Sequence, residues 1–305
     1  DKFDNKIIFN LEGPVIKNKK NHNKIKKAGP HLKNIYLPKT NRGDIAVLAN
    51  NHFMDYGING FLEAKMILEQ KKLEFVGIKL DHHNDYSYIK TYIDECSIGI
   101  LTLSEEQFGS LEQLGYGSYS NNLSVYKQIK DYKKLSDFLI LSFHGGFEMS
   151  SLPSPYHKSL LRSFIDAGVD LVYGHHSHIP QAWEIYKEKY IFYGLGNFCV
   201  DPKIWQNNAE VLWSIKPKIN IKNKKLKIII EYIEIKDFDD FVQIRVINHK
   251  HKINLIKKYL DELNEILKDK ELLEAIWQDK YLDDFENIYI KWLNLNPFIF
   301  FNFYK

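Results

Sequence analysis

Three histidines within four residues mark the stretch LVYGHHSHIP, residues 171–180. His175, His176 and His178 follow an apolar run that is typical of a buried strand. In an extended segment, side chains two positions apart point to the same face. His176 and His178 could therefore converge on one point, and two converging imidazoles are typical of a metal site. For these histidines alone, a polar turn is the alternative interpretation.

Other groups that can bind metal also follow apolar runs. Glu12 closes IIFNLE, Asn51 and His52 close IAVLANNH, and His144 closes FLILSFH. In open α/β folds, functional groups gather at the carboxyl ends of the strands. A single histidine after a strand is more often structural, but four separate strand ends that carry such groups favour a metal site. We expect these side chains to meet the histidine pair in one pocket.

The ligand types narrow the chemistry. Imidazole, carboxylate and amide oxygen form a mixed nitrogen and oxygen set without thiolate, which suits Mn, Fe or catalytic Zn. Sites of this kind often hold two divalent ions that clamp a phosphoryl group and activate water. We therefore expect divalent metal ions as cofactors, and two of them.

The elements that must position these groups alternate between strand and helix, which predicts an α/β core. Residues 57–73 have Ile58, Phe61, Leu62 and Met66 at helical spacing. A second helix is expected over 154–168, with Ser154 as N-cap, Pro155 in its first turn and Gly168 past its end. Residues 124–136 form a further helical segment.

The C-terminal third has a different pattern. Residues 211–236 alternate apolar and polar side chains around KNKK, which predicts a β-hairpin. Beyond residue 250 an apolar stripe predicts a helix, and it contains Ile256, Tyr259, Leu260, Leu263, Ile266 and Leu267. The aromatic tail NPFIFFNFYK is expected to dock onto the core, with partner binding as the alternative.

The composition argues against a disordered chain and against a nucleic-acid partner. The 305 residues are 44% hydrophobic, which is enough for a substantial core, and the net charge of +3 is small. Lysines cluster near 17–27, 130–134 and 216–227; we interpret them as solvated faces, with polyanion binding as the alternative. The small net charge and the absence of a basic stripe with stacking aromatics argue against a nucleic-acid partner.

The two cysteines, Cys96 and Cys199, both lie in apolar runs, so we expect reduced, buried thiols and a cytoplasmic protein. No apolar run reaches the roughly 18–20 residues of a membrane span. The first residues lack the basic-then-apolar pattern of a signal peptide, and the sequence does not start with Met. The oligomeric state has no signal in the sequence.

Four motifs in order carry a resemblance to a known family. The motifs NLEGP, LANNHFMDYG, HGGFE and GHHSHIPQAWEIYKEKYIFYGLGNF resemble the bacterial capsule-synthesis proteins of the CapA, poly-γ-glutamate type. Those proteins belong to the calcineurin-like metallophosphoesterase superfamily, and the match spans roughly residues 6–201. The resemblance implies an α/β fold with a metallophosphoesterase-like β-sandwich flanked by helices. We expect that domain over residues 1–240 and a helical C-terminal extension over 241–305 packed on it.

The resemblance also implies roles. Glu12 takes the place of a bridging carboxylate for which most of the superfamily has Asp. Asn51 and His176 would share one metal ion and His178 would bind the other. The implied metal ligands are Glu12, Asn51, His144, His176 and His178.

Other residues would act without binding metal. His52 would assist the leaving group or stabilise the transition state, and His175 would lie beside the ligands. Glu148 would orient a ligand, a bound water or the substrate. SEEQF at 104–108 resembles a motif of one capsule-cluster subgroup; it favours Glu106 over Glu105 as an acid that binds a substrate hydroxyl or acts as a base, with a solvated acidic turn as the alternative.

One departure from the family pattern concerns the first metal ligand. The superfamily begins with a strand that ends in a metal-binding aspartate, and this sequence has no such strand before KIIFNLE. Neither Asp1 nor Asp4 is assigned to that role. Either a strand precedes the given sequence, or the first metal position is degenerate and the site is mononuclear or inactive.

Two functions follow as hypotheses. The first is a divalent-metal-dependent phosphoesterase or phosphoryl-transfer enzyme of capsular polysaccharide biosynthesis, which acts on a phosphorylated sugar, a nucleotide-sugar or a polysaccharide. The second is a non-catalytic accessory protein of capsule polymer assembly or export. Metal content discriminates between them, since a scaffold need not hold two ions. A nucleic-acid phosphodiesterase is a weaker third hypothesis.

Overall fold

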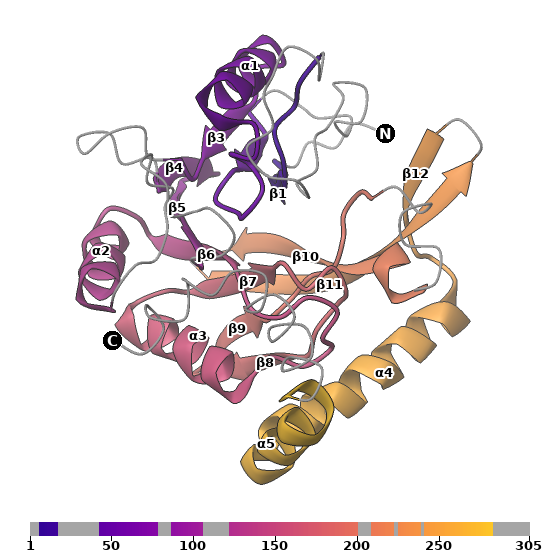
Figure 1. Ribbon diagram of the computed structural model, residues 1–305. Helices are drawn as coiled ribbons and strands as arrows, with labels where there is room; N and C mark the ends of the chain where they lie inside the picture. The colour runs from indigo at the N-terminus through magenta and orange to yellow at the C-terminus, as the bar shows by residue number, and fades with distance from the viewer. Residues whose placement is uncertain are drawn as a thin grey trace, which may run out of the picture.

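The central element of the fold is a six-stranded mixed sheet (Figure 1). The structure, a computed structural model, describes residues 6–17, 43–78, 87–105, 122–200, 209–222, 225–238 and 241–282. In the sheet the order is β4-β5-β6-β7-β9-β8, with the middle four strands parallel and the two edge strands antiparallel. The strands are β4 (Tyr88–Ile93), β5 (Cys96–Ser104), β6 (Phe138–His144), β7 (Leu171–His175), β8 (Trp183–Tyr186) and β9 (Lys189–Phe192).

A smaller parallel sheet carries the N-terminal part of the chain. Its strands are β1 (Ile8–Asn10), β2 (Ile45–Val47) and β3 (Glu74–Val76), in that order. Ile45 and Val47 of β2 belong to the main apolar core, whereas Ala46 packs with α1 (Gly57–Gln70) in a second cluster. The small sheet therefore lies between α1 and the rest of the protein.

The buried face of α1 differs from the predicted one. Phe61 is buried as expected, but Ile58, Leu62 and Met66 are 41–54% exposed. The face that packs on the sheet is a neighbouring stripe at helical spacing, and it consists of Gly60, Phe61, Ala64, Ile67 and Leu68. The helix prediction is thus confirmed and the choice of its inner face was wrong.

Two helices cover the main sheet. They are α2 (Asn122–Lys134) and α3 (Pro155–Ala167), which lie at the lower left of Figure 1, away from α1. The predicted ends of α3 are confirmed: the Ser154 side chain accepts a hydrogen bond from His157 N, proline occupies the first turn, and Gly168 follows with φ 130°.

A third sheet and two helices complete the described chain. The predicted hairpin is confirmed as β10 (Trp213–Lys222) and β11 (Lys225–Phe238), which follow the short helix η4 (Ala209–Leu212). An unpredicted strand, β12 (Phe241–Val246), pairs with β11, so the predicted domain boundary at residue 240 falls between two paired strands. The C-terminal helices are α4 (Lys250–Lys268), α5 (Lys270–Trp277) and the π-helical turn η5 (Gln278–Leu282).

Apolar side chains from all three sheets and from α2 to α5 meet in one core. Ile256, Leu260, Leu263 and Leu267 of the predicted α4 stripe are buried in it, and Tyr259 and Ile266 pack against it partly buried. The layered α/β fold with a helical C-terminal extension is therefore confirmed. The aromatic tail lies outside the described residues.

The two cysteines differ from the prediction in one respect. Both are free thiols, and Cys96 is buried in β5, but Cys199 is exposed. Strand β9 ends at Phe192, so Cys199 lies in the following loop and not in the expected strand. Among the described helices, none is both long and apolar enough to cross a membrane.

The register of the main sheet brings three strand ends to one edge. Ser104 of β5 pairs with His144 of β6, and His144 pairs with His175 of β7. Just before this edge, Gly174 lies against the turn after β9, where an added Cβ would come within 1.9 Å of the Tyr193 carbonyl oxygen. Glycine is needed there because no side chain could fit against that backbone.

Candidate metal centre

His144 and Asn51 form the buried floor of the site. His144 is the last residue of β6, and its Nε2 lies 3.0 Å from Asn51 Oδ1. Both residues are at most 5% exposed. They come from different sheets, since Asn51 follows β2 and β6 belongs to the six-stranded sheet. The site therefore forms where the two sheets meet.

Glu12 faces two of the histidines. It follows β1, and its Oε1 lies 3.8 Å from His144 Nε2 and 3.9 Å from His178 Nε2. The other carboxylate oxygen accepts a hydrogen bond of 3.3 Å from Asn10 Nδ2. One carboxylate oxygen is thus held by the protein while the other faces the imidazoles.

His176 completes the cluster. Its ring centroid lies 5.0 Å from that of His144, and Glu12, His144 and His176 each offer one ligand atom within 4.8 Å of the others. The ring of His178 is 6.4 Å from that of His176, and its Nδ1 lies 3.1 Å from Asn197 Oδ1. All five residues expected as metal ligands therefore lie in one small region.

The histidines converge for a different reason from the one predicted. Strand β7 ends at His175, and residues 176–179 form bends. His176 and His178 both take positive φ angles, of 95° and 59°. Such angles are unusual for residues with a side chain. A tight left-handed turn, and not strand alternation, aims the two rings at Glu12.

Burial keeps the imidazoles neutral. Burial, together with repulsion from His178, lowers the pKa of His176 to about 3. Burial lowers the pKa of His175 to about 4, and burial followed by the charges of neighbouring histidines lowers the pKa of His144 well below its usual value. Because metal ions bind the unprotonated imidazole, these rings are ready to coordinate at neutral pH.

The ring of His52 contacts a buried carboxylate. Its Nδ1 lies 2.9 Å from Asp55 Oδ2, and Asp55 is 1% exposed. Asn50 fixes the same turn, because its Oδ1 accepts hydrogen bonds from the backbone nitrogens of His52 and Phe53. The turn after β2 therefore presents Asn51 and His52 in defined directions.

Two of the remaining predicted residues, Glu148 and His175, adjoin the cluster. Glu148 Oε1 is 3.9 Å from His176 Nε2, and its side chain is 46% exposed. The ring of His175 packs edge-on against Tyr173 at 5.3 Å. Glu106 lies outside the described residues, whereas Glu105 accepts hydrogen bonds from His157 and from Gly146 N.

Several contributing residues were not predicted. Asp55 lies three residues after His52, whose ring it contacts, and His157 lies three residues after Ser154, whose side chain caps α3. Both contacts lie within a turn or a helix start. Asn197 belongs to the GLGNF motif, which signalled a site without naming a residue. These residues support their neighbours from helix starts and turns, so a search of strand ends does not find them.

The residues present fit a divalent metal. Two ligands of one ion, each about 2.0–2.2 Å from it, lie at most about 4.4 Å apart. The 3.8 and 3.9 Å separations from Glu12 Oε1 fall within that limit, and the 4.8 Å bound for Glu12, His144 and His176 lies slightly above it. The buried Nδ1 atoms of His144 and His176 have no hydrogen-bond partner among the described residues. Imidazole nitrogens with carboxylate and amide oxygens beside them suit Mn, Fe or Zn.

Comparisons with known proteins show which family this chain matches. A family described as "Bacterial capsule synthesis protein PGA_cap" matches residues 4–202. The chain is 32% identical over 214 residues to "Capsule biosynthesis protein CapA" of Bacillus anthracis, which covers 64% of this chain and 50% of that protein. It is also 27% identical over 185 residues to "Probable polyglutamine synthesis accessory protein Rv0574c" of Mycobacterium tuberculosis (strain ATCC 25618 / H37Rv). That alignment covers 56% of this chain and 49% of the mycobacterial protein.

The chain spans about half the length of these curated relatives. Among solved structures, a putative 5'-nucleotidase from Staphylococcus aureus in complex with α-ketoglutarate is similar with a TM-score of 0.45 and 16% identity. That match covers 72% of this chain and 42% of the other.

Proposed function

Because the chain belongs to the bacterial capsule synthesis protein family PGA_cap, we propose that it is a divalent-metal-dependent phosphoesterase or phosphoryl-transfer enzyme of capsular polymer biosynthesis. The observation that carries this proposal is the convergence of Glu12, His144 and His176, with ligand atoms within 4.8 Å of one another. Asn51 and His178 adjoin the same cluster. This mixture of imidazole, carboxylate and amide groups is the one that Mn, Fe and catalytic Zn take as ligands.

The five converging residues would hold the metal. Asn51 and His176 would be ligands of one ion and His178 of the other, and Glu12 and His144 would be further ligands. Bound divalent ions would neutralise charge on a phosphoryl group and lower the pKa of a water molecule. The protein supplies neutral imidazoles for this purpose, because burial lowers the pKa values of His144 and His176.

His52 would act on the leaving group. Its Nδ1 is engaged by Asp55 at 2.9 Å, which makes Nε2 the nitrogen that can face a substrate. From there it would donate a proton or a hydrogen bond to the departing oxygen. Asp55 keeps the ring oriented during that transfer, and Glu148, at 3.9 Å from His176, would orient a substrate or a water at the exposed rim.

The substrate class is an anionic phosphoryl compound of polymer synthesis, either a phosphorylated sugar, a nucleotide-sugar or a polysaccharide. The chain has only three arginines, and Arg162 is engaged by both carboxylate oxygens of Glu184. The metal ions would therefore carry most of the attraction for the phosphoryl group.

A non-catalytic accessory protein of capsule polymer assembly or export is the second candidate. The name of the mycobacterial relative, an accessory protein, favours it. Such a protein would not need His52 and Asp55 poised beside the cluster, nor the strained turn at His176 and His178.

Metal analysis followed by an activity panel separates the two functions. The purified chain is analysed for bound metals and then offered phosphomonoesters, phosphodiesters and nucleotide-sugars with added Mn²⁺, Fe²⁺ or Zn²⁺. We expect bound metal and a turnover that a chelator abolishes, with neither in the His144→Ala/His176→Ala double variant. A chain that binds no ion and hydrolyses none of these compounds would favour the accessory function.

A further inference from the structure

Glu105 encloses the end of strand β6 from two sides. Its backbone nitrogen donates to the His144 carbonyl oxygen at 2.9 Å. Its side-chain Oε2 accepts from the backbone nitrogen of Gly146, also at 2.9 Å. The segment His144–Gly145–Gly146 is therefore attached at both ends to one residue of the neighbouring strand end.

The HGG motif explains how the carboxylate reaches this position. A Cβ on Gly145 would come within 2.8 Å of both Glu105 Cβ and Glu105 Oε2. Gly146 has φ 98°, a conformation that residues with side chains rarely adopt. The first glycine makes space for the acid, and the second turns the chain so that its nitrogen faces the acid.

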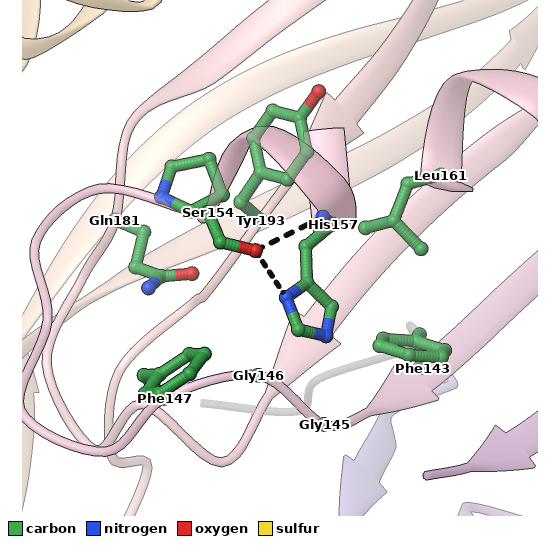
Figure 2. A pocket seen from close by; sticks show the side chains of 10 residues that line it. Phe143, Gly145, Gly146, Phe147, Ser154, His157, Leu161, Gln181 and Tyr193 are labelled. Atoms are coloured by element: carbon green, nitrogen blue, oxygen red, sulfur yellow. Dashed lines mark hydrogen bonds between the residues drawn. The ribbon is translucent and has the colours of Figure 1, made fainter. Parts of the chain in front are cut away.

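A chain of hydrogen bonds fixes the carboxylate from behind. His157 Nε2 lies 3.1 and 3.2 Å from the two oxygens of Glu105, and His157 Nδ1 lies 2.7 Å from Ser154 Oγ. Figure 2 shows Ser154 and His157 facing each other in the pocket that Gly145 and Gly146 also line. The chain thus runs from the N-cap of α3 to the loop that carries His144.

The chemistry of the groups sets the direction of these bonds. Burial alone would raise the pKa of Glu105, but the hydrogen bonds from His157 and from the Gly146 nitrogen lower it below its ordinary value. An ionised carboxylate only accepts, so His157 Nε2–H donates to it. In the tautomer with its proton on Nε2, Nδ1 is an acceptor, and the Ser154 hydroxyl can donate to that atom.

His157 cannot move away from this arrangement easily. It is 7% exposed, and its ring contacts Phe143 and Phe147 at centroid distances of 6.2 and 6.4 Å. Both phenylalanines flank the HGG segment, so the imidazole is held by packing against the same loop that it supports through Glu105.

We propose that Glu105, His157 and Ser154 are positioning residues that hold the His144–Gly145–Gly146 segment in the geometry that binds metal. This inference rests on the proposed metal site and adds three residues that do not bind the ion themselves. Partners behind a ligand typically change metal affinity by about 10–100-fold when they are removed.

The order of hydroxyl, imidazole and carboxylate is also that of a serine hydrolase triad, but Ser154 does not suit a nucleophile. Its Oγ caps α3 by accepting a hydrogen bond from His157 N at 3.1 Å. The residue is 6% exposed, so a substrate could not reach the hydroxyl without displacing the helix start.

The first experiment measures metal affinity by titration of Mn²⁺ or Zn²⁺ into the metal-free full chain. We expect Glu105→Ala to weaken binding by about 10–100-fold, and His157→Ala to weaken it in the same direction. Glu95→Ala, which removes an exposed glutamate from the turn before β5, serves as the matched control and should bind as the unmodified chain does.

Glu105→Gln separates position from charge. A glutamine can still accept from Gly146 N, and its amide can donate to His157 Nε2 once the ring changes tautomer, so the hydrogen-bond chain survives in the reverse direction. We expect Glu105→Gln to regain most of the affinity that Glu105→Ala loses. Equal losses in the two variants would show that the charge of Glu105, and not its positioning role, sets the affinity.

Hydrogen exchange of the metal-free chain provides a second, independent readout. Peptides that cover residues 143–149 should exchange faster in Glu105→Ala than in Glu105→Gln or Glu95→Ala, while peptides from β7 stay unchanged. If the unmodified chain binds no metal but this local acceleration is seen, the proposed function fails, while the finding that Glu105 holds the His144–Gly145–Gly146 segment stands. If metal binds and Glu105→Ala changes neither affinity nor exchange, the positioning role is overturned while the proposed function remains.

Discussion

At the scale of single residues, His176 and His178 both adopt positive φ angles, which residues with side chains rarely take. A residue with a side chain in the left-handed region costs on the order of 1–3 kcal/mol, and this turn contains two of them. Glycine would relieve the cost but would remove the imidazoles. The backbone strain is therefore the structural cost of aiming both rings at Glu12 from one short turn.

His176→Ala tests the ligand set. We expect the variant to lose bound metal and activity together, by more than the about 10–100-fold that loss of a supporting contact costs, because a ligand and not a neighbour is removed. Metal content by mass spectrometry and a binding titration measure the effect. His249→Ala, at an exposed position before α4, is the control; metal content equal to that control would remove His176 from the ligand set.

His52→Ala tests the division between ligands and catalytic groups. We expect turnover to fall by about 10²–10⁴-fold, the usual contribution of general acid–base catalysis, with metal content intact. Asp55→Asn should lower turnover in the same direction, because Asp55 orients the ring at 2.9 Å. A loss of metal from His52→Ala would show that His52 is a ligand.

Residue types at strand ends could be predicted because an apolar run followed by a polar group is visible in sequence. His144 and Asn51 were found in this way. Asp55 and His157 could not be, because each faces its partner within a turn or a helix start, where no period distinguishes a supporting side chain from a solvated one.

At the scale of elements, α1 shows the limit of periodicity. Its sequence carries two adjacent apolar stripes, and only the contacts with the small sheet decide which one is buried. The hairpin β10–β11 was predictable because its alternation has a period of two and a polar turn in the middle. Strand β12 was missed although its sequence FVQIRV also alternates apolar and polar residues, and its pairing with β11 extends the hairpin by a third strand.

The helix α5 is coupled to the site loop through one aromatic contact. Trp277 is 9% exposed, and its ring lies 4.9 Å from that of Phe147, three residues after His144. We expect Trp277→Ala to lower the free energy of unfolding by about 3–5 kcal/mol, as for other buried large-to-small changes.

Urea unfolding measures this loss, and Leu272→Ala, at a 43% exposed position of α5, provides the control. Because Phe147 belongs to the same loop as Gly146, the variant should also weaken metal binding. A stability equal to that of the control would mean that α5 is not anchored through Trp277.

At the scale of the whole molecule, the ligands come from two sheets. Glu12 and Asn51 follow strands of the small sheet, while His144 ends a strand of the large sheet and His176 follows another. A bound ion would connect the two sheets at their common edge. Because a ligand that binds the native state stabilises it, metal should stabilise the molecule as a unit.

A thermal unfolding series measures this effect. At a free metal concentration 100 times the dissociation constant, we expect about 2.7 kcal/mol of added stability, seen as a higher midpoint for the whole transition. The His144→Ala/His176→Ala double variant should show no shift. An equal shift in that variant would place the stabilising ion elsewhere on the chain.

The spread of the ligands along the chain also has a kinetic consequence. Asn51 and His144, whose side chains lie 3.0 Å apart, are separated by 93 positions in the sequence. Contacts of such long range close late, because the loop entropy must be lost before the contact forms. An ion that needs both sheets would then be absent from the folding transition state. It would leave the rate of folding nearly unchanged and slow the rate of unfolding, so that the bound ion lengthens the lifetime of the native protein without guiding its formation.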